Sequence, residues 1–120
     1  MPVDGSPSNG TGYMSPPKKT KVYIGVCNGD WPGTVFVLHN GTEYKLPHHV
    51  KHSPDGFSWG YGGSGPSELA KDMLWDFLGY EPEPALYQTF KMIFIATLDQ
   101  RAGFTIYGEK IRHWLEEHGR

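Results

Sequence analysis

The stretch Gly60–Gly65 brings this sequence closest to a motif with known chemistry. Its residues, GYGGSG, match the dinucleotide pattern G-x-G-x-x-G, and Gly60–Ser67 nearly match the phosphate-binding loop G-x-x-x-x-G-K-[ST]. Pro66 stands where that loop has its lysine, so the main positive charge for phosphate is missing. A dinucleotide fold also requires a strand after the helix, whereas GYEPEP and a second helical pattern follow here. We therefore predict neither nucleotide hydrolysis nor hydride transfer.

A more general use of this stretch remains, because glycine-rich backbone at the start of a helix leaves N–H groups free to bind an anion. We expect Lys51 or His52 to add positive charge there. The predicted ligand-binding residues are Gly60, Tyr61, Gly62, Gly63, Ser64, Gly65, Ser67, Lys51 and His52. The alternative is architectural: the glycines only permit positive φ angles and close packing of neighbouring rings against the helix. The residue types leave both interpretations open.

The other potentially reactive side chains give weaker indications of a functional site. In HHVKH, His48 and His52 have the i, i+4 spacing of helical metal ligands, but Pro47 and the following SPDG argue against a helix. We predict no metal site and no cofactor. Ser64 lacks the second glycine of a nucleophile elbow. A hydrolase that uses Ser64 or His52 is the least favoured function, and no catalytic residue is predicted.

The elements that must position the glycine-rich stretch begin with strands. KVYIGV, at 21–26, is typical of a strand, and Asn40-Gly41 between two strand-like runs predicts a β-hairpin over residues 34–46 with a type I′ turn. FSWGY, at 57–61, predicts a further short strand. We expect its first two rings in the core and Tyr61 at the surface.

Three helices are predicted after these strands. The first begins near Pro66, with Ser64 or Gly65 as its cap and Glu68 in its first turn, and ends at Gly79. The other two are expected over 84–98 and 108–119, with a short strand at 103–107 between them. Strands precede helices instead of alternating with them. The predicted fold class is α+β, a small antiparallel β-sheet followed by three helices packed on it.

One segment of the chain resembles a known family. HSPDGFSWGYGGSGPSELAKDML, followed by YQTFKMIFIATL and IRHWL, is similar to a family of small uncharacterised bacterial, archaeal and phage proteins with the signature HSPxGFxWGYGGSGPxxLA. The resemblance runs from about Lys21 to Leu115, and Ser67 departs from the alanine common at that position. It implies a shared fold and a shared use of the loop, and occurrence in mobile elements implies an accessory or host-directed role. It implies no activity.

Bulk properties narrow the function further. The chain has 120 residues, one cysteine and a formal net charge of −2. Residues 1–20 read as a flexible Pro/Gly/Ser-rich tail and 21–120 as a single domain. We expect a cytoplasmic protein with no membrane span, and non-specific DNA binding is disfavoured because the chain has no basic excess.

The leading hypothesis is a small non-catalytic binding module for an anionic ligand or nucleotide. The alternative is a mobile-element protein that inhibits a host complex through acidic helices at 66–78 and 108–119, because residues 61–120 hold six basic and nine acidic side chains.

Overall fold

The computed structural model describes residues 20–27 and 31–119. The predicted tail over 1–20 lies outside the described residues, except for Thr20. The elements in chain order are β1 (Val22–Val26), β2 (Thr34–His39), β3 (Thr42–Lys45), α1 (Ser64–Leu78), α2 (Pro84–Phe90), η2 (Lys91–Ile95), β4 (Phe104–Tyr107), α3 (Gly108–Trp114) and η3 (Leu115–Gly119). Of these, η2 and η3 are π-helical continuations of α2 and α3.

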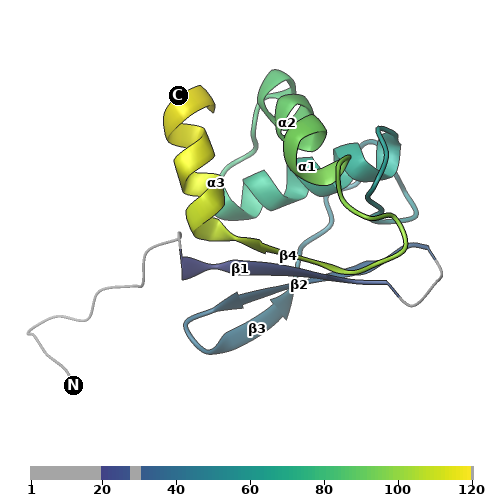
Figure 1. Cartoon of the computed structure of the whole chain (residues 1–120), viewed down its shortest axis with the longest axis horizontal. Helices are drawn as coiled ribbons and strands as arrows, with labels where there is room; N and C mark the ends of the chain where they lie inside the picture. Colours follow the sequence, from purple (N-terminus) through teal and green to yellow (C-terminus); the bar gives the residue numbers. More distant parts are fainter. Residues whose placement is uncertain (1–19, 28–30, 120) are drawn as a thin grey trace, which may run out of the picture.

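The strands form one antiparallel sheet in the order β3-β2-β1-β4. Figure 1 shows the helices gathered on one side of this sheet. The predicted α+β class is therefore confirmed. No helix of the described chain is long and apolar enough to cross a membrane.

The hairpin forms as predicted because its turn chemistry is local. Asn40 and Gly41 have φ angles of 57° and 77°, as a type I′ turn requires. The pair joins β2 to β3, in which Val37 lies opposite Tyr44. The strand predicted over 57–61 does not form, since Phe57 makes only an isolated bridge to Gly33.

The core lies between the sheet and α1. Tyr23, Val37, Leu69 and Met73 are fully buried, and Trp59 is fully buried beside them as predicted. Phe57 is 6% exposed, which also agrees with the prediction. Burial of such side chains contributes roughly 1.5–3 kcal/mol each.

A polar contact attaches the end of α1 to the sheet. The Asp76 carboxylate accepts hydrogen bonds from Tyr23 Oη at 2.6 Å, from Tyr44 Oη at 2.8 Å and from Lys21 Nζ at 3.0 Å. Burial and the neighbouring Asp76 charge raise the pKa of Tyr23, and burial and the hydrogen bond to Asp76 raise that of Tyr44. Both phenols therefore stay protonated and act as donors. One turn later Gly79 ends α1 in the predicted left-handed conformation, with φ at 88°.

Candidate functional site

The glycine-rich stretch enters α1 earlier than predicted. Gly63 is the N-cap, no side chain caps the helix, and Ser64 is the first helical residue. The prediction that Ser64 or Gly65 is the cap is therefore wrong, and the helix starts two residues before the predicted Pro66. Pro66 is tolerated at the third helical position because the first four N–H groups of a helix need no intrahelical acceptor.

Two glycines of this stretch are fixed by close contacts. Gly60 has a φ of +90°, its N–H donates to the Ile95 carbonyl at 3.0 Å, and a Cβ there would lie 2.6 Å from Gln100 Cα. A Cβ on Gly65 would collide with Ser58 Oγ. Both positions thus require glycine for packing, as the architectural interpretation expects.

The remainder of the stretch borders an open cleft. This aromatic cleft has a volume of about 560 Å³ and is lined by residues that include Trp31, Asp55, Ser58, Tyr61, Ser64 and Gly65. Trp31 is 40% exposed and Tyr61 41% exposed, so both rings are accessible from solvent. Tyr61 is the exposed ring that the sequence predicts, and its hydroxyl shares a 2.8 Å hydrogen bond with Ser58 Oγ.

A lysine that sequence reasoning missed lies beside the same stretch. Lys91 Nζ donates to Ser67 Oγ at 3.1 Å and to the Gly62 carbonyl at 3.4 Å. Ser67, a predicted ligand residue, is buried and donates to Gln88 Oε1 at 3.2 Å. Lys91 lies more than twenty residues away in the sequence, and no local pattern marks it. The helix α2 and its continuation η2 bring it there.

Lys51 and His52 make their hydrogen bonds on another part of α1. Their backbone N–H groups donate to the Glu68 carboxylate at 2.9 and 2.8 Å. The His52 ring is hydrogen-bonded to Tyr87 Oη at 2.7 Å. Neither residue is among those that line the aromatic cleft. The structure therefore joins Tyr61, Ser64 and Gly65 in one cleft and places Lys51 and His52 at a different contact.

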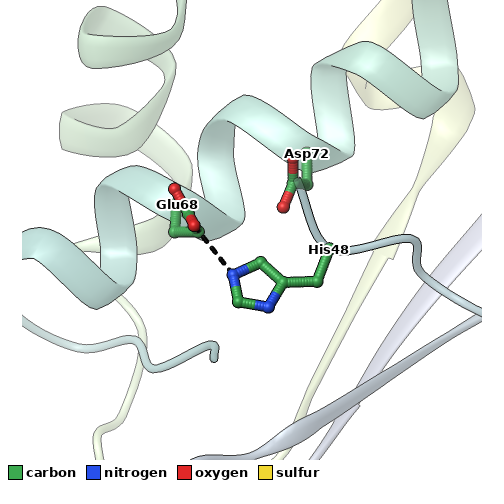
Figure 2. A group of neighbouring side chains, drawn as sticks. All are labelled: His48, Glu68 and Asp72. Atoms are coloured by element: carbon green, nitrogen blue, oxygen red, sulfur yellow. Dashed lines mark hydrogen bonds and ion pairs between the residues drawn. The ribbon is translucent and has the colours of Figure 1, made fainter. Parts of the chain in front are cut away.

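That contact belongs to a charge cluster of four side chains, His48, Glu68, Lys71 and Asp72, of which all but His48 are buried, and we call it the buried charge cluster. Figure 2 shows His48 reaching from its loop toward Glu68, with Asp72 one turn further along the helix. His48 Nε2 donates to Glu68 at 2.7 Å, and Lys71 Nζ donates to Asp72 at 2.8 Å and to the His49 carbonyl. Glu68 is 0% exposed, and Lys71 and Asp72 are 1% exposed. The cluster fixes the loop of residues 47–52 on α1.

Glu68 does not act mainly as the predicted first-turn charge, since it is the fifth residue of α1 and binds that loop. Burial opposes its ionisation, but the donors from His52, Lys51 and His48 and the Lys71 charge outweigh burial, so its pKa is lowered. Asp72 has fewer donors, so burial keeps its pKa raised despite Lys71 and the His49 amide. Two carboxylates one turn apart are thus shifted in opposite directions.

Three members of this cluster have the geometry of metal ligands. One ligand atom from each of His48, Glu68 and Asp72 lies within 4.8 Å of the others. The Lys71 ammonium is 2.8 Å from Asp72 and 3.7 Å from Glu68, so a positive charge already lies among the carboxylates. The arrangement therefore fits an internal ion pair better than a cation site.

Ser64 and His52 are not brought together. Ser64 begins α1 at the aromatic cleft, whereas the His52 ring is hydrogen-bonded to Tyr87. Among the described residues no hydrogen bond joins the two. The geometry thus provides no serine–histidine pair of the kind that a hydrolase requires.

Comparison with known proteins gives a family without an activity. The family model described as a family of unknown function (DUF6166) matches residues 28–117. The chain belongs to DUF6166. No curated protein and no solved structure matches it. The DUF6166 match includes the glycine-rich stretch and the buried charge cluster, so both regions lie within the family's shared sequence.

Proposed function

We propose that this DUF6166 protein is a small non-catalytic binding module that holds an anionic small molecule, of nucleotide type, in the aromatic cleft. The observation that carries the proposal is a cleft of about 560 Å³ at the first turn of α1. Small-molecule sites commonly measure 300–1,000 Å³ and combine apolar walls with a few polar groups.

Different groups in the lining of the cleft suit different parts of such a ligand. Ser64 begins the helix, where the dipole favours negative charge, and beside this helix start, outside the lining, Lys91 Nζ lies 3.4 Å from the Gly62 carbonyl. Trp31 and Tyr61 are 40% and 41% exposed, and stacking a base on such rings contributes roughly 1–3 kcal/mol. Asp55, also in the lining, accepts hydrogen bonds from amino or hydroxyl groups.

A charge placed at the helix start tests the proposal. Ser64→Asp favours the helix by about 0.3–1 kcal/mol through the dipole but repels an anion. We expect calorimetry with nucleoside mono-, di- and triphosphates and inorganic phosphate to detect binding by the wild type, at least about tenfold weaker binding by Ser64→Asp, and a thermal midpoint that does not fall.

Gly62→Ala is the matched control, because a Cβ at Gly62 meets no atom within 4 Å. It should bind as the wild type does. Lys91→Met should weaken binding of phosphorylated ligands and leave a nucleoside unaffected. Absence of binding by the wild type, or equal binding by Ser64→Asp, would reject the anion site.

A second candidate is recognition of a basic host protein by an accessory protein of a mobile element. The observation in its favour is an acidic surface at the end of the chain, where Glu109, Glu116 and Glu117 are each more than half exposed. Arg112 and His113 pair with these carboxylates and reduce their charge. Pull-down with wild type and with Glu116→Lys/Glu117→Lys should recover one partner from host lysate with the wild type alone. Equal recovery would remove this candidate.

A further inference from the structure

The face of the sheet that points away from α1 is unusually apolar. Tyr23 and Val37 point toward the helices and are fully buried, so their neighbours in β1 and β2 point to the opposite side. The apolar side chains of this outer face are Val22, Ile24, Val26, Phe36, Leu38 and Tyr107. A sheet covered on one side normally carries polar side chains on the other. Figure 1 shows no helix of the described chain on this side.

The register arranges the outer face in rows across the strands, two of which run through all four strands. One row runs Glu43, Leu38, Val22 and Tyr107, in the order of strands β3, β2, β1 and β4. The adjacent row of side chains on the same face consists of Lys45, Phe36, Ile24 and Thr105, in the same strand order. Each row therefore has a charged end on β3 and an apolar centre, and the two charges are opposite.

We propose that a second copy of this chain covers the outer face, with a two-fold axis that lies across the strands between the two rows. Such an axis lays one row of each copy over the other row of its mate. Leu38 then faces Phe36 of the second copy, and Val22 faces Ile24. Glu43 faces Lys45 of the second copy, and the same ion pair forms twice.

The charges select this axis over the alternative. An axis parallel to the strands would bring β3 over β4 of the second copy, so that Glu43 would face Tyr107 and Lys45 would face Thr105. Both charged residues are exposed, and within the described residues neither makes a salt bridge. A net charge of −2 adds little repulsion between copies.

The size of the face sets the strength of the dimer. Four strands spaced about 4.8 Å apart and about 17 Å long cover a footprint of roughly 300–400 Å². A standard interface buries about 800 Å² on each partner, so the proposed dimer is at the weak end and depends on concentration.

Sedimentation equilibrium over a range from low micromolar to near-millimolar protein tests the proposal. We expect the average mass of the wild type to rise from one chain toward two. Leu38→Lys should remain monomeric throughout, and Met92→Lys, a change on an exposed residue of η2, should dimerise as the wild type does. Circular dichroism establishes that both variants are folded.

A charge exchange tests the axis itself and uses exposed positions that leave the core intact. Glu43→Lys alone and Lys45→Glu alone should each weaken dimerisation by about tenfold, because like charges then face each other. The double variant Glu43→Lys/Lys45→Glu should restore the wild-type affinity. Absence of that rescue would overturn the proposed axis. A wild type that stays monomeric at every concentration would overturn the dimer and leave the face to a different protein.

Discussion

The aromatic cleft and the buried charge cluster lie on the same helix, yet they have opposite characters. Ser64 begins α1 at the cleft, and Glu68 is only one turn further on. In the cluster Glu68 is 0% exposed and accepts three hydrogen bonds. In the cleft Trp31 and Tyr61 are each about two-fifths exposed, at 40% and 41%.

Comparison of the two regions shows that residues of reactive types are not necessarily accessible. The cluster contains a histidine, two carboxylates and a lysine, but these groups bind one another and the loop above them. Removing buried charges from water is costly, and here the internal donors offset that cost. The cleft has fewer ionisable groups, but Trp31, Tyr61 and Ser64 in its lining are exposed. The proposed ligand site therefore depends on the accessibility of its side chains and not on the number of charged groups.

The largest effect should come from breaking the cluster. Glu68→Gln removes one of the two carboxylate charges beside Lys71 and weakens the hydrogen bonds of Lys51 and His52, so we expect the free energy of unfolding to fall by about 3 kcal/mol. Urea unfolding of the wild type and the variant measures this difference in free energy. Glu81→Gln, at an exposed position, is the control and should change stability by less than about 0.5 kcal/mol. A loss below about 1 kcal/mol for Glu68→Gln would mean that the cluster is not the main attachment of its loop.

The acid limb of the stability profile should distinguish the two carboxylates. The folded pKa of Glu68 is below its unfolded value, so its contribution is complete above the usual glutamate pKa of about 4.3 and is lost as the pH falls through the folded pKa. The folded pKa of Asp72 is raised, so its protonation in acid acts in the opposite direction and favours the folded state.

Urea midpoints between pH 3 and 7 test this pair. Glu68→Gln should make the decline of stability toward acid less steep, and Asp72→Asn should make it steeper. Equal slopes in both variants would contradict the opposite shifts.

A smaller effect is expected where the end of α1 meets the sheet. Tyr44→Phe removes one of the hydrogen bonds to Asp76, and Lys21 and Tyr23 remain as donors. We expect a loss of about 1 kcal/mol in urea unfolding. Tyr80→Phe, at a ring that is 59% exposed, serves as the comparison and should have no measurable effect. Equal losses in both variants would show that the hydrogen bond from Tyr44 to Asp76 adds no stability.

The smallest change should be in the cleft. Tyr61→Phe removes the hydroxyl bonded to Ser58 at a half-exposed position, and we expect the free energy of unfolding to change by less than about 0.5 kcal/mol. The ring remains, so ligand affinity in calorimetry should be retained, whereas Tyr61→Ala should lose it. A loss of several kcal/mol on Tyr61→Phe would make the cleft a structural region like the cluster.

Local chemistry explains which parts of the fold were predictable. The Asn40-Gly41 turn and the Gly79 helix end depend on φ angles that few residues adopt, so the sequence marks them directly. The start of α1 was misplaced because proline suits several positions in a helix's first turn. Phe57 lies in a strand-like pattern but finds only a bridge to Gly33, because no neighbouring strand extends beside it.

The candidate site was less predictable from local chemistry, because part of it is formed by residues that are distant in the sequence. Tyr61, Ser64 and Gly65 are predicted together because they are close in the sequence, and the structure places all three in the lining of one cleft. Trp31 and Lys91 were missed, since the tertiary fold alone brings them to that stretch. Periodicity alone assigns the polar side of a helix to solvent, but the loop of residues 47–52 covers Glu68, Lys71 and Asp72.

By itself the sequence determined the α+β class, the hairpin and the glycine-rich stretch that leads into α1, because each follows from the conformational preferences of neighbouring residues. Only the tertiary structure decided which charges are buried with partners and which side chains remain open to a ligand. Those outcomes depend on contacts between residues far apart in the chain, and no local preference encodes them.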